Sequence, residues 1–496
     1  MHTKYYIGFD LGSSSVKVAL VDAATGENIL SIHEPQYEMS ILSEQSDWAE
    51  QNPNDWWTYI CQATKRILNE SKIDASKILA VGISYQMHGL VIVDSKGQAL
   101  KNAIIWCDSR AVEIGNKAFQ DLSPERCTKT LLNSPANFTA SKLKWVKDNE
   151  PELFDKIHKF MLPGDFIAYK LTNEIFTTKN GLSEGIFWDY KSNNIAEWLL
   201  DYFGFNPDLV PKVVDNFSPQ GYITNKASLE TGLPEGIPIT YRAGDQPNNA
   251  LSLNVFNDGE VAATGGTSGV IYAVTNNKNS KESSRINHFA HVNYSDDNHT
   301  IGKLLCINGA GIMYRWLRNQ SSAESYETMN RIASKVPVGS DGLVILPFGN
   351  GAERMLNNQN IGTQFCNINL NQHSKAHLYR AALEGIAFSF VYGMEILKND
   401  NAKIKVIRAG NDNLFRSEIF AKTLATLIDF EIEIYNTTGA VGAARAAGLT
   451  DKNFDRFGKN ITKNDHVMTF NPIENKTPYL DAYQNWKTEL EKQIKN

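Results

Sequence analysis

The sequence predicts an α/β protein built from two similar domains, and three observations lead to this prediction. The chain has 496 residues, which is more than one hydrophobic core usually supports. Short apolar runs of strand length alternate along it with longer runs of helical periodicity. A turn rich in Gly, Ser and Thr lies between two strand-like runs near residue 12 and again near residue 266. We therefore expect one domain over residues 1–250 and another over residues 251–496.

The composition is that of an ordinary globular protein, with 42% apolar and 21% charged residues. The net charge of −6 offers no basic surface for nucleic acid. The five cysteines contain no C-x-x-C pair, so we expect neither a disulfide framework nor a zinc site, and a reducing, cytoplasmic location. The start of the chain lacks a secretory apolar region, and no apolar stretch is long enough to span a bilayer. Neither a membrane nor nucleic acid is an expected partner.

The first domain opens with two strands, at residues 5–10 and 16–21, joined by a turn, and a third strand follows at about residues 28–33. Asp10 stands at the entry of the turn, and Ser13 and Ser14 lie within it. A turn of this kind can present main-chain N–H groups to a phosphate, although a plain β-turn is the alternative.

The turn near residue 266 repeats this pattern. Residues 12–16 (GSSSV) align with residues 266–270 (GTSGV), and strand-like runs flank both. The repeat indicates an internal duplication, with one phosphate-facing hairpin in each domain. Thr264 stands in the second copy where Asp10 stands in the first, as expected if a single Mg²⁺ lies on one side of a nucleotide's phosphates.

Between these turns we expect a helix at 55–70, a buried strand at 78–83, strands at 90–94 and 103–106, helices within 111–203, and strands and turns over 222–243. Polar residues at strand ends are where α/β proteins place ligands. Gln86, Met87 and His88 follow one strand and are suited to contact a polyol; a backbone-bonded loop histidine and a core methionine are the alternatives. Asp108 and Arg110 follow another strand, and a structural ion pair is the alternative there.

Asp245, on a Gly-Asp-Gln turn, supplies a lone carboxylate close in sequence to the second phosphate-facing turn. An acid near a phosphate-binding turn is the arrangement for transferring a phosphoryl group to a hydroxyl. Beyond the turn we expect an exposed hairpin over 276–300 and helices at 309–317, 374–397 and 415–427. Strands are expected at 344–348, 405–409 and 431–435, and a small-residue helix from Gly439. The strand, Gly/Asn turn and helix around Gly410 and Asn413 form a recurrent nucleotide-site pattern.

Taken in order, these motifs resemble the FGGY carbohydrate kinases over nearly the whole chain. The matching segments are residues 7–13 (IGFDLGS), 86–89 (QMHG), 106–110 (WCDSR), 142–145 (KLKW), 244–246 (GDQ), 266–269 (GTSG), 351–354 (GAER), 383–385 (LEG) and 439–444 (GAVGAA). Within the family, the Met87–His88 pair is similar to the xylulokinases. The sequence departs from the family pattern at Asn411–Asp412, which affects the expected adenine contacts, and at Gln246–Asn249, which affects sugar choice.

The resemblance implies two ribonuclease-H-like domains of the actin/hexokinase type with a central cleft, and ATP-dependent phosphorylation of D-xylulose to D-xylulose 5-phosphate. It implies Asp245 as the general base and Asp10 as a ligand of Mg²⁺, directly or through water. The sugar-binding residues would be Gln86, Met87, His88, Trp106, Asp108 and Gln246. The ATP-binding residues would be Ser13, Ser14, Lys17, Gly266, Thr267, Gly311, Arg315, Gly410 and Asn413. An FGGY kinase for another sugar or polyol, such as ribulose, gluconate or glycerol, and a non-catalytic nucleotide-dependent sensor are the alternatives. Family habit is compatible with a homodimer.

Overall fold

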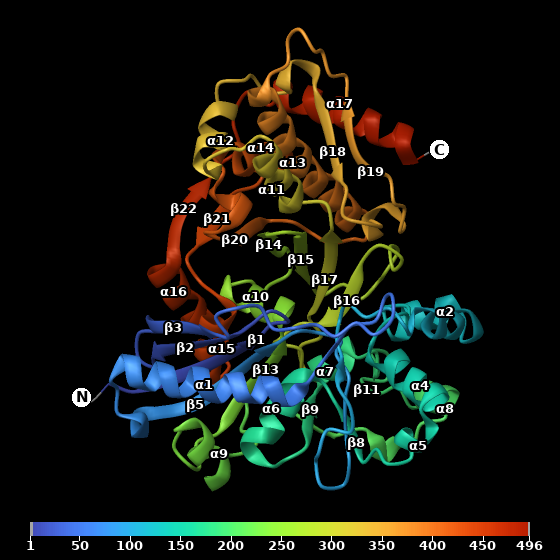
Figure 1. Ribbon diagram of the computed structural model, residues 1–496, viewed down its shortest axis with the longest axis vertical. Helices are drawn as coiled ribbons and strands as arrows, with labels where there is room; N and C mark the ends of the chain where they lie inside the picture. The colour runs from blue at the N-terminus through green and yellow to red at the C-terminus, as the bar shows by residue number, and fades with distance from the viewer. Residues whose placement is uncertain (1–2, 495–496) are drawn as a thin grey trace. The chain divides into compact units, whose positions relative to one another are not determined.

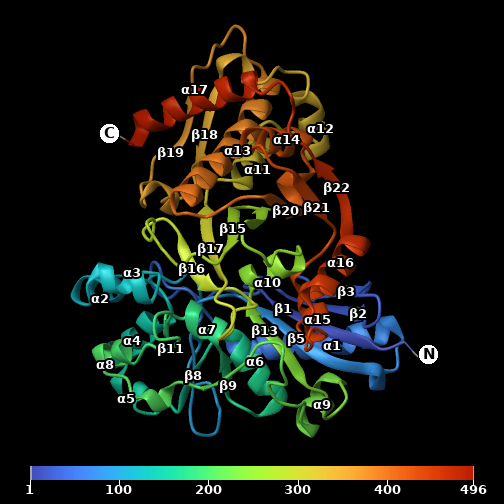
Figure 2. The same cartoon turned by 180° about the vertical axis from the view of Figure 1, so that it is seen from behind.

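The computed structural model describes residues 3–494 (Figures 1 and 2). The chain forms two compact units. Unit 1 comprises the chain up to Phe256 together with residues 289–301 and 437–464, and unit 2 comprises residues 257–288, 302–436 and those from Asp465 onward. Residues 437–464 therefore belong to compact unit 1, although the sequence predicted them in the second domain. Within residues 3–494, no helix is long and apolar enough to cross a membrane.

Unit 1 is organised around a five-stranded sheet of order β3-β2-β1-β5-β13, in which β1 is antiparallel to β2 and parallel to β5. The strands of the unit are β1 (Tyr5–Leu11), β2 (Val16–Asp22), β3 (Asn28–Glu34), β4 (Glu50–Gln51), β5 (Ile78–Tyr85), β6 (Val91–Val93), β7 (Ala103–Ile104), β8 (Lys159–Met161), β9 (Phe176–Thr178), β10 (Trp188–Asp189), β11 (Asn194–Ile195), β12 (Lys212–Val214) and β13 (Ile239–Gly244). Its helices are α1 (Pro53–Ser71), α2 (Val112–Asp121), α3 (Pro124–Thr130), α4 (Thr139–Asn149), α5 (Pro151–Phe154), α6 (Pro163–Thr172), α7 (Lys179–Glu184), α8 (Glu197–Phe203), α9 (Asn225–Thr231), α10 (Asp245–Ser252), α15 (Gly439–Ala447) and α16 (Phe454–Asp465).

The alternation in β1 determines which helix covers each face of this sheet. Ile7 and Phe9 are fully buried in the same apolar core as Trp56 and other residues of α1. Gly8 points to the opposite face, where a side-chain carbon would lie 2.2 Å from the main-chain oxygen of Ala440 in α15. The two helices lie on opposite faces of the sheet (Figures 1 and 2). Asp10 shares its face with Gly8, so it lies on the α15 side.

Unit 2 contains a seven-stranded sheet of order β16-β17-β15-β14-β20-β21-β22. The strands are β14 (Glu260–Gly265), β15 (Gly269–Thr275), β16 (Asn287–Ala290), β17 (Ile301–Ile307), β18 (Val344–Phe348), β19 (Gly362–Cys366), β20 (Val406–Gly410), β21 (Ile432–Tyr435) and β22 (His466–Phe470). The helices are α11 (Gly311–Gln320), α12 (Tyr326–Ala333), α13 (Lys375–Asn399), α14 (Glu418–Ile428) and α17 (Thr477–Ile494). The buried α13 shares one apolar core with β14, β15 and Trp486 of α17.

The central strands of the two sheets follow the same plan. The order β2-β1-β5-β13 in unit 1 corresponds to β15-β14-β20-β21 in unit 2, with one antiparallel hairpin followed by two parallel neighbours in each case. Asp10 pairs with Lys17 in the last pair but one before the first turn, and Thr264 pairs with Val270 in the last pair but one before the second. The aligned turns thus have equivalent places in their sheets, as the duplication predicts.

Several local predictions differ from the structure. The expected exposure of the 276–300 hairpin is wrong at β16, because this strand pairs with β17 in the main sheet and His288 is fully buried. His288 is held there by Asp400, with a distance of 2.9 Å between Nε2 and Oδ2, and Lys303 donates to the same carboxylate oxygen at 2.7 Å. Residues 159–161 form strand β8 within a predicted helix. Residues 225–231 form helix α9, where strands and turns were expected.

Candidate functional sites

The candidate site of unit 1 lies at the carboxyl ends of three parallel strands. Tyr85 of β5 pairs with Leu11 of β1 on one side and with Gly244 of β13 on the other. This register brings together three segments that are far apart in sequence: Asp10, the loop 86–88 and Asp245. The carboxyl ends of parallel strands are the usual ligand edge of an open α/β sheet.

Asp10 lies between a strand neighbour and the start of α15. Ser84 Oγ donates to Asp10 Oδ1 at 2.9 Å. A side-chain carbon on Gly439, the first residue of α15, would lie 2.6 Å from Asp10 Oδ2, so glycine is needed for this close approach. The carboxylate therefore faces the amino-terminal end of a helix, where the helix dipole favours negative charge.

Asp245 begins α10 directly after β13 and is only partly exposed. Burial, followed by the negative charge of Asp10, raises the pKa of the Asp245 carboxyl from 3.8 to about 7. Hydrogen bonds from the main chain and side chain of Gln246 oppose the shift, because they stabilise the charged form. A carboxyl with a pKa near 7 is suited to accept a proton at neutral pH.

His88 is held in a restrained conformation in the loop after β5. Its φ is 62°, in the left-handed region that few non-glycine residues adopt. Nδ1 of His88 lies 2.9 Å from the main-chain oxygen of Glu184, which can only accept, so Nδ1 carries the proton. The rings of Phe138 and Phe289 pack on the imidazole with centroids 4.8 and 5.1 Å away, and Lys142 Nζ donates to the His88 carbonyl at 3.0 Å.

Met87 is buried beside Glu184, a residue that the sequence analysis did not single out. A side-chain carbon on Gly244 would lie 2.5 Å from Met87 Cγ and 2.4 Å from Glu184 Oε2. Burial raises the pKa of Glu184 well above its usual range, and the charges of Asp245 and Asp165 add to this shift. Met87, His88, Glu184 and Asp245 are called the Asp245 cluster below.

Several buried oxygen atoms without a hydrogen-bond partner belong to residues of this cluster or to residues close to them in sequence. Within residues 3–494 they include Oε1 of Gln86, Oε1 of Glu184, Oε1 of Gln246 and Oδ1 of Asn248. Buried polar atoms in native proteins are usually hydrogen-bonded. The unsatisfied oxygens of Gln246, which is bonded to Asp245, and of Glu184, which packs against Gly244, therefore suit a ligand that donates hydroxyl hydrogens.

The structure places the other predicted residues of unit 1 as follows. Asp108 is fully buried, accepts from the main-chain N of Ala49 at 2.6 Å and pairs with Arg110 at 2.7 Å, which is the structural ion pair that the sequence left open. Trp106 is half exposed. In the first turn, the carbonyl of Ser13 accepts from Gln51 and that of Ser14 accepts from Met39. These two hydrogen bonds fix the turn to the segments that carry Gln51 and Met39. Lys17 is exposed in β2.

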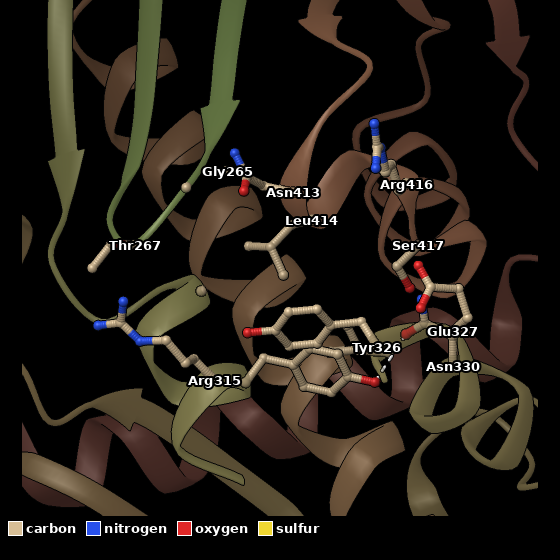
Figure 3. Close-up of a pocket in the computed structure, with 14 residues that line it drawn as sticks. Gly265, Thr267, Arg315, Tyr326, Glu327, Asn330, Asn413, Leu414, Arg416 and Ser417 are labelled. Carbon is tan, nitrogen blue, oxygen red and sulfur yellow. Dashed lines mark hydrogen bonds between the residues drawn. The ribbon is translucent and has the colours of Figure 1, made fainter. Parts of the chain in front are cut away.

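Unit 2 contains a cavity of about 490 Å³ next to the second turn. Its lining includes the predicted residues Gly266, Thr267, Gly311, Arg315 and Asn413, but not Gly410. Thr267 and Arg315 lie toward one end of the cavity, and Glu327, Asn330 and Ser417 lie toward the other (Figure 3). The cavity thus has a glycine-rich turn and the guanidinium of Arg315 at one end, and polar side chains at the other.

The glycine-rich end of the cavity is held by main-chain contacts. The N–H groups of Gly311 and Ile312 donate to the carbonyls of Gly266 and Thr267 at 3.1 and 3.0 Å. A side-chain carbon on Gly311 would lie 2.3 Å from the Gly266 oxygen, so this contact requires glycine. The buried Glu353 accepts from the N–H groups of Asn308 and Gly309 at 2.9 and 2.6 Å, which fixes the loop leading into α11.

Aromatic residues that the sequence analysis did not name line the middle of the cavity. Tyr314 and Tyr326 are stacked with ring centroids 5.7 Å apart, and Tyr314 donates to Asn330 at 2.9 Å. Leu414 lies across from them, and Ser417 Oγ is buried without a hydrogen-bond partner among the described residues. Flat apolar surfaces with a polar far end are suited to a planar, hydrogen-bonding ring such as a nucleobase.

Comparison with known proteins identifies a family and a fold for most of the chain. The N-terminal domain model of the FGGY family of carbohydrate kinases matches residues 5–252, and the C-terminal domain model matches residues 261–450. A xylulose kinase of Staphylococcus xylosus is 26% identical over 502 residues, covering 98% of this chain and 99% of that protein.

Two solved structures have the same fold. The xylulose kinase of Rhodospirillum rubrum superposes with a TM-score of 0.88 at 22% identity, covering 99% of this chain and 100% of that one. The glycerol kinase of Plasmodium falciparum, solved with ADP, gives a TM-score of 0.88 at 20% identity, covering 99% and 98%. The predicted pair of ribonuclease-H-like α/β folds is confirmed.

Proposed function

The chain belongs to the FGGY family of carbohydrate kinases, and we propose that it transfers the terminal phosphoryl group of ATP to D-xylulose, giving D-xylulose 5-phosphate and ADP. The choice of acceptor is supported by the full-length similarity to a xylulose kinase. One observation carries the chemistry: Asp245 has a pKa of about 7, and side-chain oxygens of its neighbours Gln246 and Glu184 are buried without a hydrogen-bond partner within residues 3–494.

In the proposed reaction, Asp245 accepts the proton of the attacking sugar hydroxyl. The hydroxyl oxygen forms a bond to the terminal phosphorus as the bond from that phosphorus to the bridging oxygen breaks, and ADP leaves with the electron pair. Phosphoryl transfer passes through a loose transition state, so orienting the hydroxyl contributes more than a strong base would. His88 offers Nε2 as an acceptor when its ring is neutral, because Nδ1 donates to the Glu184 carbonyl.

The unit 2 cavity would hold ATP. Main-chain N–H groups and Arg315 suit the phosphates, while Tyr326 and Leu414 would enclose the base, with Ser417 as a polar contact at the far end. Ser417 Oγ is the most specific support, because it is buried, lines the cavity and lacks a partner within the described residues.

Magnesium would be held mainly by ATP. Residues 3–494 contain no group of three or more His, Cys, Asp or Glu side chains placed to hold a metal ion. Mg²⁺ in nucleotide sites typically keeps water and phosphate ligands and uses one or two carboxylates, so Asp10 alone fits this requirement, directly or through water. The ion would neutralise negative charge that develops on the phosphates.

A coupled assay of ADP release tests the proposal. D-xylulose, D-ribulose, L-ribulose, glycerol and gluconate are compared side by side with the wild-type protein and with Asp245→Ala. We expect D-xylulose to give the highest kcat/KM, and Asp245→Ala to lose at least about 1,000-fold in kcat while still binding ATP. If another acceptor gives the highest kcat/KM, that compound and not D-xylulose is the substrate. Near-normal turnover of Asp245→Ala would show that this carboxyl is not the base.

A further inference from the structure

We propose that Glu184 is a positioning residue of the sugar site, which holds Met87 and His88 against the turn that carries Asp245. This inference rests on the proposed kinase function but not on the identity of the sugar. Glu184 is the last residue of α7 and is almost completely buried. It therefore links α7 to the ends of β5 and β13. No predicted site residue lies on α7.

Glu184 contacts the turn through its carboxyl group. Oε2 packs against Gly244, the residue before Asp245, next to Met87 Cγ. Any side chain at position 244 would collide with both groups, so the absence of a side chain there makes room for the carboxyl and the methionine together. Removing the Glu184 carboxyl would open space beneath Met87 and beside the first residue of α10.

Glu184 also restrains His88 in two ways. Its main-chain oxygen accepts from Nδ1 of the imidazole at 2.9 Å, and its carboxyl accepts a hydrogen bond from the main-chain N–H of His88. The second bond supports a residue whose φ of 62° is costly for a side chain other than glycine. Both the ring and the backbone of His88 are thus fixed by one residue.

The surroundings of the Glu184 carboxyl favour its neutral form, because burial and nearby negative charge raise its pKa. The titratable groups facing it are Tyr85 from β5, Asp165 from α6 and Asp245 from α10, and the nearby Arg242 pairs with Asp165 at 3.0 Å. Burial and the two neighbouring carboxylates raise the Glu184 pKa well above its usual range. Glutamine, which has nearly the same shape and carries no charge, should therefore replace it well.

Steady-state kinetics of Glu184→Gln and Glu184→Ala tests the proposal, using whichever acceptor the wild-type protein phosphorylates fastest. We expect Glu184→Ala to raise the KM for the acceptor at least tenfold and to leave the KM for ATP within twofold. Glu184→Gln should restore the acceptor KM to within threefold of wild type. It should also leave the acidic limb of the kcat/KM profile unmoved, because the raised pKa of Glu184 disfavours a charge there in the wild-type protein.

Ser183→Ala is the matched control. Ser183 is buried next to Glu184 on the same helix; it donates to the Asn180 carbonyl at 2.8 Å and accepts from the N–H of Ala290 at 2.9 Å. This variant should lower the melting temperature without changing the acceptor KM. The inference is overturned if Glu184→Ala keeps a wild-type acceptor KM, if Ser183→Ala raises it equally, or if Glu184→Gln is as impaired as Glu184→Ala. A wild-type protein that consumes no ATP with any acceptor would instead refute the proposed function and this inference together.

Discussion

Asp245→Asn should make the protein more stable at pH 8 while it abolishes catalysis. The Asp245 carboxyl holds its proton more tightly in the folded chain, where its pKa is about 7, than in the unfolded chain, where 3.8 is ordinary. Its contribution to stability is therefore complete below about pH 4 and is lost as the pH rises through about 7. Asparagine is neutral at every pH and avoids this loss.

The size of the effect follows from the two pKa values. Each pH unit between them corresponds to about 1.4 kcal/mol, and the part that falls between pH 5 and pH 8 amounts to about 2 to 3 kcal/mol. For a domain of roughly 150–250 residues, 1 kcal/mol shifts the melting temperature by about 2–4 °C. The advantage of Asp245→Asn over wild type should thus grow by about 5 to 10 °C between pH 5 and pH 8.

Thermal unfolding of both proteins at pH 5 and pH 8, without ligands, measures this difference. Taking the difference between two proteins cancels groups such as Glu353 that titrate alike in both. Asp201→Asn, an exposed position in the same unit, is the control and should change the melting temperature little at either pH. The reasoning is refuted if Asp245→Asn melts at a lower temperature than wild type at pH 8. It is also refuted if the difference in melting temperature is the same at pH 5 and pH 8, because the Asp245 pKa would then not be raised in the folded protein.

Three further predictions concern catalysis and ligand binding. Because the proposed base is active only when ionised, kcat/KM for the acceptor should fall about tenfold between pH 8 and pH 6, and a flat profile over that range would contradict a pKa of about 7 for Asp245. His88→Ala should raise the KM for the acceptor at least tenfold and leave the KM for ATP unchanged; an equal loss for both ligands would place His88 outside the sugar site. Glu353→Gln replaces one acceptor oxygen with an amide donor that faces a main-chain N–H. It should therefore raise the KM for ATP at least fivefold and leave the KM for the acceptor unchanged. An unchanged KM for ATP would show that the loop before α11 does not shape the unit 2 cavity.

Sequence periodicity was sufficient to find the strands whose ends form the site of unit 1. The alternation of Ile7 and Phe9 with Gly8 predicts a strand with two different faces, and the polar run after β5 predicts a ligand edge. Both follow from local patterns, because a strand's side chains alternate by geometry alone. The aligned turns near residues 12 and 266 were equally visible, since a duplicated hairpin leaves the same small residues in both copies.

Residues contributed by neighbouring helices could not be found in this way. Glu184 ends a six-residue helix with no charge pattern of its own, and only the tertiary fold brings its carboxyl against Gly244. Tyr326 and Asn330 lie one helical turn apart on α12, as any two residues of an amphipathic helix do. Their place in the lining of the unit 2 cavity depends on how α12 packs beside α11, which no local signal in the sequence specifies.

The same period of two that builds β1 also determines where its acid can act. Gly8 and Asp10 share a face, and the missing side chain at Gly8 lets α15 approach until its backbone touches the sheet. That approach brings Gly439, the first residue of α15, to the Asp10 carboxylate, so a packing requirement also places a helix amino terminus beside the charge. In the second copy of the hairpin Thr264 replaces the acid, and the glycines of its turn instead border the cavity next to Gly311. The two turns thus have equivalent places in their sheets, but a carboxylate precedes the first turn, whereas a threonine precedes the second, whose glycines line a cavity.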